Sequence, residues 1–201
     1  DGKDPIAFDH DCREGICGMC GAVVNGRAHG PEKGTTLCQL HMRHFSNGDT
    51  IVIEPWRARA FPIIKDLVVD MEPFFEKYRS IKPFFINYEP EPPTERYQSP
   101  EDRARFDDTT KCILCGACTS SCPSFWGNHD YVGPAAIVQA HRFIFDSRDQ
   151  GANERLEVLN DRDGVWRCRT VFNCVGACPR DIDVTRAIGE VKKLLLFNRM
   201  V

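Results

Sequence analysis

The sequence predicts an α+β protein in which a small strand-rich domain, residues 1–60, precedes an all-helical domain, residues 61–201. Three observations predict this arrangement. Short β-branched runs separated by turn residues occupy the first part of the chain. Apolar residues at helical spacing occupy much of the remainder. Three groups of cysteines are spread over both parts, which indicates that each domain is built around bound metal.

Charge and hydropathy exclude two broad classes of protein. The chain has 201 residues and a formal net charge of −3, so no basic surface favours nucleic acid as a partner. No apolar run reaches the ~18 residues that a membrane-spanning helix requires. We therefore expect a globular protein whose function resides in its cysteines.

The chain contains eleven cysteines, which is a large number for its length. A disulfide framework would favour an even count and a secreted protein. The cysteines instead divide into groups of four, four and three, with none left over. This division favours metal clusters in a reducing compartment.

Two cysteine runs in the second domain resemble each other. The first reads C-x2-C-x2-C-x3-C-P, the spacing of bacterial ferredoxins, in which the first three cysteines bind one cluster and the fourth binds another. The second matches it except that Val171 stands where the first has Cys115. The runs comprise Cys112, Cys115, Cys118 and Cys122, and Cys168, Cys174 and Cys178.

Exchange of the last cysteine between the runs predicts two different clusters. A [4Fe–4S] cluster would take Cys112, Cys115, Cys118 and Cys178. The other site would have only Cys122, Cys168 and Cys174, because valine has no lone pair for iron. We infer a [3Fe–4S] cluster there, and the alternative is a [4Fe–4S] cluster with a non-cysteine ligand. Structural zinc is disfavoured, because zinc sites need neither the exchange nor the prolines.

The first cysteine group reads C-x4-C-x2-C with a distant fourth cysteine, the plant-type [2Fe–2S] pattern. Its members are Cys12, Cys17, Cys20 and Cys38. The interleaved Gly15, Gly18 and Gly21 would let backbone amides approach the sulfurs. A zinc knuckle is the alternative. Short strands at 22–24 and 50–54 around the loop predict a plant-type ferredoxin β-grasp domain whose first strands are expected upstream of residue 1.

Four histidines near this loop are interpreted as surface or packing residues. A Rieske centre requires two cysteine–histidine pairs, and four cysteines already complete the site. These histidines are His10, His29, His41 and His44.

Helical patterns fill most of the second domain. Apolar spacing predicts helices over residues 63–78, 135–145 and 153–159, although Pro73 interrupts the first pattern. Ser99 followed by Pro100 is typical of a helix start. A last helix is expected to be capped by Asp183 or Thr185. The proline-rich stretch 88–94 is expected to be extended.

These motifs, in this order, resemble the iron–sulfur subunit of succinate dehydrogenase and fumarate reductase. The resemblance covers essentially the whole chain. Its matching segments are residues 12–18, 66–71, 112–118, 122–126, 173–179 and 185–189. It implies an electron-transfer subunit of succinate:quinone oxidoreductase (respiratory complex II) in which electrons pass singly through [2Fe–2S], [4Fe–4S] and [3Fe–4S] clusters to quinone. No catalytic residue is expected in this chain.

The resemblance also implies partners. A flavoprotein subunit containing FAD would oxidise succinate, and one or more membrane anchor subunits, which can carry haem b, would bind quinone. The chain would then lie peripherally on the cytoplasmic face of a bacterial inner membrane, or on the matrix face in a mitochondrion. The quinone-side pocket would include Pro123, Ser124, Trp126, Arg169 and Val171. Trp126 could donate its indole N–H to a quinone carbonyl or stack on the ring.

Three departures from the common members of the family leave the quinone open, with menaquinone as an alternative to ubiquinone. Gly127 replaces a second tryptophan, Arg169 replaces a histidine, and residues 27–36 resemble an insertion. The rival functions are the cluster subunit of another fumarate reductase and a free ferredoxin-like carrier. A thiol-dependent reductase is disfavoured, because the chain has no adjacent cysteine pair.

Overall fold

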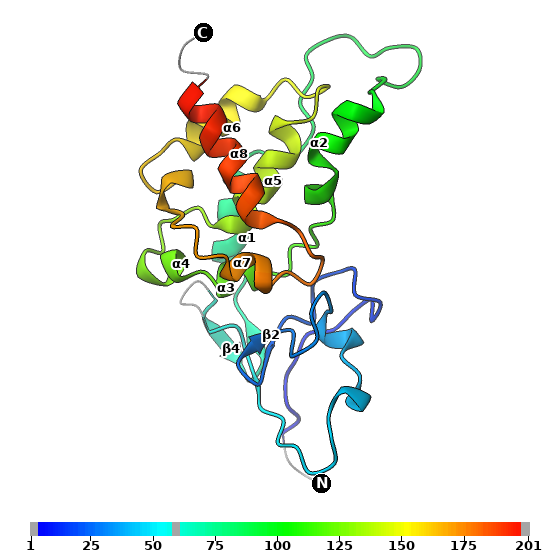
Figure 1. Ribbon diagram of the computed structural model, residues 1–201, viewed down its shortest axis with the longest axis vertical. Coiled ribbons are helices and arrows are strands. Elements are labelled where there is room, and N and C mark those ends of the chain that lie inside the picture. The colour runs from blue at the N-terminus through cyan, green and yellow to red at the C-terminus, as the bar shows by residue number, and fades with distance from the viewer. Residues whose placement is uncertain (1–3, 58–60, 198–201) are drawn as a thin grey trace.

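The computed structural model describes residues 4–57 and 61–197. Its two parts lie end to end along the long axis of the molecule (Figure 1). The strand-containing N-terminal part forms one end and a group of packed helices forms the other. Two short helices, α3 (Ala117–Ser120) and α7 (Asn173–Gly176), lie where the helical part faces the N-terminal part. The predicted order of a strand-rich part before a helical part is confirmed.

A small antiparallel sheet forms the N-terminal part, with strand order β2-β1-β3. Its strands are β1 (Val23–Val24), β2 (Arg27–Ala28) and β3 (Ile53–Glu54). Asn25 and Gly26 form the turn between β1 and β2 and both have positive φ, the conformation that favours Asn-Gly in tight hairpins. Two 3-10 helices, η1 (Leu37–Gln39) and η2 (Met42–His44), follow. The predicted strands are confirmed but are shorter than expected.

The prediction of a helix over residues 63–78 is wrong in its first half. This half forms a hairpin of β4 (Ile63–Lys65) and β5 (Val68–Val69), and helix α1 (Glu72–Ser80) begins only afterwards. The β-branched residues favour strands, and Pro73 lies in the first helical turn, where proline is tolerated. The chain after residue 61 is therefore not all-helical. The proposed boundary at residue 60 adjoins residues 58–60, which lie outside the described residues, and stays a prediction.

The remaining helices surround a central one, α5 (Pro134–Ile144), which is buried on nearly every side. It packs against α2 (Pro100–Thr110), α6 (Ala152–Leu159) and α8 (Val184–Phe197). Two short elements, α4 (Pro123–Gly127) and η3 (Val165–Arg167), complete this part. Ser99 caps α2 by accepting a hydrogen bond from the Asp102 amide (3.0 Å), as predicted. Asp183 accepts from the Arg186 amide (2.9 Å) and so caps α8.

One buried ion pair fixes the chain where it leaves α1. Arg155 and Asp149 are both fully buried, and Arg155 Nη1 lies 2.6 Å from Asp149 Oδ1. Arg155 Nη2 also donates to the carbonyls of Lys82 (3.1 Å) and Phe84 (2.7 Å). The other Asp149 oxygen accepts from the Ile86 amide (2.9 Å). The pair thereby satisfies the backbone of a stretch that has no regular structure.

Replacing Arg155 by Met should destabilise the fold by about 3–5 kcal/mol, because the Asp149 carboxylate would remain buried without its partner. The matched control is Arg79→Met, whose side chain is 55% exposed in its pair with Glu72 and should cost less than about 1 kcal/mol. Denaturant unfolding of the loaded protein under anaerobic conditions measures both. Equal unfolding midpoints for the two variants would contradict the role of the pair.

Candidate iron–sulfur sites

The first cysteine loop directs backbone amides at its sulfurs. The amides of Glu14 (3.4 Å) and Ile16 (3.5 Å) donate to Cys12 Sγ, and the Met19 amide donates to Cys17 Sγ (3.5 Å). Gly15 and Gly18 both have positive φ, which lets the chain turn back on the sulfurs. The two amides lower the pKa of Cys12 to about 7. This environment stabilises a thiolate, the form that binds iron.

Three cysteines of this group line one groove. They are Cys17, Cys20 and Cys38. Thr36 Oγ1 lies 3.4 Å from Cys38 Sγ. Burial raises the pKa of Cys20 to about 11, so metal binding there must displace a proton. The four cysteines therefore lie in one loop region, and their role as [2Fe–2S] ligands stays a prediction.

The two cysteine runs of the helical part form two neighbouring cavities with the predicted exchange. Cys178, from the second run, lines the first cavity, and Cys122, from the first run, lines the second. The four-cysteine cavity is lined by Cys112, Cys115, Cys118 and Cys178. The three-cysteine cavity is lined by Cys122, Cys168 and Cys174, together with Val171. The structure thus brings together the groups that the spacing predicts.

The backbone repeats the same conformation in both runs. Leu114 and Gly116 have positive φ in the first, and Thr170 and Phe172 have positive φ at the corresponding positions of the second. In each run the second of these residues precedes a short helix, α3 or α7, and the two helices pack together. The repeated conformation explains how each run can supply its last cysteine to the other cavity.

The donor chemistry of the two cavities fits iron–sulfur clusters. Burial raises the pKa of Cys115 to about 12, and raises that of Cys118 well above the usual value. Burial likewise raises the pKa of Cys122 and Cys174. Clustered thiols in an apolar enclosure remain protonated without metal, and a bound cluster stabilises them as thiolates.

The first cysteine loop touches the four-cysteine cavity directly. Trp56 is 2% exposed, and its indole N–H donates to the Cys115 carbonyl (3.1 Å). A Cβ on Gly21 would lie 2.6 Å from Trp56 Nε1, and a Cβ on Gly18 would lie 2.4 Å from the Ile113 carbonyl oxygen. Both positions therefore require glycine, and Gly21 serves this contact rather than an approach of amides to sulfur. The cysteine pattern gave no indication of Trp56.

Four of the five expected quinone-side residues lie together. Pro123, Ser124, Arg169 and Val171 line the three-cysteine cavity. Trp126 lines a different cleft, and its indole N–H already donates to the Ser120 carbonyl (2.8 Å). Its ring is 52% exposed. Stacking therefore agrees with this geometry, whereas donation to a quinone would require the bond to Ser120 to break.

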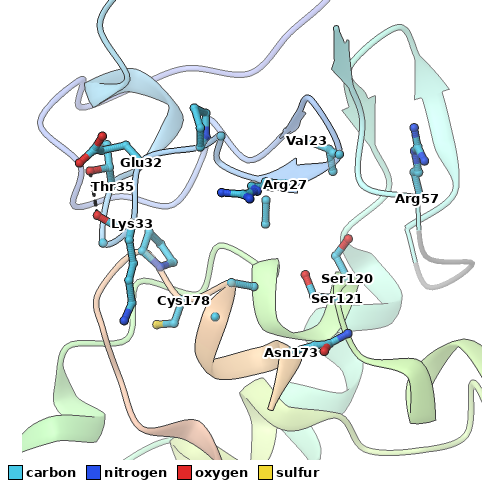
Figure 2. A pocket seen from close by; sticks show the side chains of 18 of the residues that line it. Val23, Arg27, Glu32, Lys33, Thr35, Arg57, Ser120, Ser121, Asn173 and Cys178 are labelled. Carbon is cyan, nitrogen blue, oxygen red and sulfur yellow. Dashed lines mark hydrogen bonds between the residues drawn. The ribbon is translucent and has the colours of Figure 1, made fainter. Parts of the chain in front are cut away.

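The segment resembling an insertion forms one wall of that cleft, and helices α3 and α7 form the other (Figure 2). Arg27 points into the cleft, and Lys33 and Cys178 both line it. A Cβ on Gly34 would lie 2.6 Å from Asp181 Oδ2, so the segment packs against the chain just after Cys178. The cleft that it borders also includes Cys178 and Pro179, which line the four-cysteine cavity.

The interpretation of the histidines is confirmed. His10, His41 and His44 are exposed, whereas His29 is buried. His29 Nδ1 accepts a hydrogen bond from the Leu37 amide (3.2 Å), and its ring packs edge-on against Trp56. Burial lowers the pKa of His29 to about 4, so it is a neutral packing residue.

Comparison with known proteins identifies both halves of the chain. A 2Fe-2S iron-sulfur cluster binding domain matches residues 1–76, and a 4Fe-4S dicluster domain matches residues 104–179. The succinate dehydrogenase iron-sulfur subunit of Coxiella burnetii is 40% identical over 192 residues, which are 95% of this chain and 77% of that protein. That of Paracoccus denitrificans is 37% identical over 195 residues, covering 96% and 71% of the two chains.

The chain belongs to the succinate dehydrogenase iron–sulfur subunit family. The mitochondrial succinate dehydrogenase [ubiquinone] iron-sulfur subunit 1 of Oryza sativa subsp. japonica is 40% identical over 198 residues, covering 96% of this chain and 67% of that protein. A chain of the Mycobacterium smegmatis Sdh1 complex in the apo form has a TM-score of 0.83 at 26% identity, covering 98% of this chain and 80% of that one. Among the described residues, none of the helices has the length and apolarity needed to cross a membrane.

Replacing Gly18 by Ala should slow electron transfer out of the first loop by at least about tenfold, a barrier increase of about 1.4 kcal/mol. The added methyl would push the loop away from Ile113. Gly26→Ala is the matched control, because Gly26 has the same φ of +77° but no atom within 4 Å of its Cβ position. Reduction of both centres by succinate in the complete complex, followed by rapid-freeze paramagnetic resonance, measures the rate. Equal slowing in both variants would assign the effect to backbone strain instead.

Proposed function

We propose that this chain passes electrons one at a time from an FAD-containing flavoprotein subunit to quinone at a membrane anchor, within a succinate:quinone oxidoreductase. The observation that carries the proposal is the arrangement of the eleven cysteines in three adjoining groups. The loop of the first group touches the loop of Cys115 through Gly18 and Trp56. Helix α3, which lines the four-cysteine cavity, in turn packs against helix α7, which lines the three-cysteine cavity. The groups therefore form a continuous series through the molecule.

The expected clusters are [2Fe–2S], [4Fe–4S] and [3Fe–4S] in that order, and when bound they supply the sites that accept and release single electrons. This chain's own residues hold and tune them. Backbone amides donate to Cys12 and Cys17, and apolar burial encloses the four-cysteine cavity. Val171 leaves one corner of the last site without a thiol. A [4Fe–4S] cluster with a non-cysteine ligand there is the alternative.

The quinone-side pocket is proposed beside the three-cysteine cavity. Pro123, Ser124, Arg169 and Val171 line this cavity, and Val171 is 51% exposed. An exposed apolar surface next to the last cluster is suited to a quinone held between this chain and the anchor. Gly127 and Arg169 depart from the usual ubiquinone-reducing pattern, and ubiquinone and menaquinone both remain candidates.

The finer assignments follow from the same proposal. The sheet of β1, β2 and β3 would be part of a plant-type β-grasp that faces the flavoprotein. The anchor would lie against the helical part, on the cytoplasmic face of a bacterial inner membrane or the matrix face in a mitochondrion. The family relationship does not favour a free ferredoxin-like carrier.

Paramagnetic resonance of the anaerobically purified complex tests the proposal. A [2Fe–2S] signal should appear with succinate, and a three-iron signal should appear on oxidation. Val171→Cys should convert the three-iron signal to a four-iron one after reconstitution, because the missing thiol is restored. Val175→Cys is the control, since Val175 lies on α7 but does not line the cavity. Only four-iron and [2Fe–2S] signals, unresponsive to succinate, would overturn the proposal.

The resemblance implies that Trp126 contacts the quinone, although it lines an adjoining cleft that shares Asn173 with the three-cysteine cavity. On that proposal, replacing Trp126 by Ala should slow quinone reduction about tenfold, because an aromatic contact contributes about 1.4 kcal/mol. Transfer from succinate to a soluble dye should remain unchanged. Trp126→Phe separates the two possible roles: it should retain most of the quinone activity if the ring stacks, because the N–H is already bonded to Ser120. Comparable loss of dye and quinone reduction would contradict a position at the pocket.

A further inference from the structure

The three-cysteine cavity contains a buried hydroxyl that has no partner. Tyr131 is completely buried, and its hydroxyl makes no hydrogen bond within the described part of the chain. The side chain lines the cavity. A phenol donates one hydrogen bond, and a buried donor without an acceptor is costly to a fold. The orphaned hydroxyl therefore indicates an acceptor that the protein alone does not provide.

The surroundings of Tyr131 identify the kind of acceptor. Cys122, Cys168 and Cys174 line the same cavity as Tyr131, so their sulfurs and any cluster that they hold are the nearby acceptors. The ring is held in place: it packs at 6.3 Å from Phe125, and the Val132 amide donates to the Asp163 carbonyl (2.9 Å). The ring is thus held at the wall of the cavity that the three cysteines also line.

The two cavities differ in their hydroxyl content. The three-cysteine cavity is lined by four residues with hydroxyls, namely Ser124, Tyr131, Thr170 and Thr185. Of these, Thr185 Oγ1 lies 3.7 Å from Cys174 Sγ. The residues that line the four-cysteine cavity include no serine, threonine or tyrosine. The two cysteine runs have the same backbone conformation. The cavities therefore differ chemically through these hydroxyl-bearing side chains.

We propose that the Tyr131 hydroxyl donates a hydrogen bond to a sulfur of the cluster in the three-cysteine cavity and raises its reduction potential. A donor to sulfur stabilises the reduced cluster, which carries one more negative charge. Tyr131 is accordingly a positioning and tuning residue that favours electron transfer toward this site. The inference rests on the proposed function, because it requires an iron–sulfur cluster in the three-cysteine cavity. A three-iron or a four-iron cluster satisfies this requirement.

The test is a redox titration of the complete complex, followed by paramagnetic resonance. Tyr131→Phe removes only the hydroxyl and should make reduction of this cluster about tenfold less favourable, which is 59 mV for one electron. The potentials of the other two clusters should not change. Tyr97→Phe is the matched control, because Tyr97 is 80% exposed. An unchanged potential for this cluster in Tyr131→Phe would overturn the inference.

A second measurement applies if Tyr131→Phe fails to take up the cluster. The chain has four tyrosines, and 3-fluorotyrosine, a more acidic phenol, is a stronger donor. Uniform substitution should raise the potential of this cluster, and no shift would overturn the inference. If Tyr131→Phe does take up the cluster, incorporating 3-fluorotyrosine into that variant should not change the reduction potential of this cluster. The wild-type spectrum tests the proposed function separately, because it reports the cluster type irrespective of any shift.

Discussion

The contact between Trp56 and Cys115 joins the first cysteine group to the four-cysteine cavity, and the proposed electron path depends on this junction. The indole N–H holds the carbonyl of a predicted cluster ligand, while Gly18 and Gly21 bring the first loop within contact distance of it. A tryptophan of this size, once buried, contributes apolar area as well as its hydrogen bond. The same residue thus stabilises the junction of the two parts and sets the separation of the first two cysteine groups.

Beyond this junction, the fold depends on metal. Helices α3 and α7 have only four residues each, far fewer than an isolated helix needs to be stable. Each helix lies between a cysteine that lines the four-cysteine cavity and a cysteine that lines the three-cysteine cavity. A cluster bound in either cavity would therefore fix both cysteine runs. Burial raises the pKa of most of these thiols, which opposes thiolate formation in the absence of metal. Cluster binding is therefore expected to contribute directly to folding in this region.

The sequence predicted the features that depend on local spacing and missed those that depend on distant partners. The spacing of each run predicts the exchange of Cys122 and Cys178; Cys178 lines the four-cysteine cavity and Cys122 the three-cysteine cavity, and their roles as ligands stay predictions. Apolar periodicity over residues 63–78 suggested a single helix, but β-branched residues and Pro73 divide it into a hairpin and α1. Trp56 was missed because its partner, Cys115, lies 59 residues away.

Apolar side chains are exposed at both ends of the proposed electron path and buried in its middle, as expected for electron transfer between two partner subunits. At the first loop, Ile16 is 56% exposed and Met19 is 50% exposed, and at the three-cysteine cavity Phe172 is 58% exposed. Cys115, between them, is buried. Exposed apolar side chains at both ends are suited to interfaces, whereas the burial of Cys115 would shield a cluster in the four-cysteine cavity from water. On the proposed path, electrons would therefore enter and leave at the two exposed ends, and the proposed Tyr131 donor would favour transfer toward the three-cysteine site.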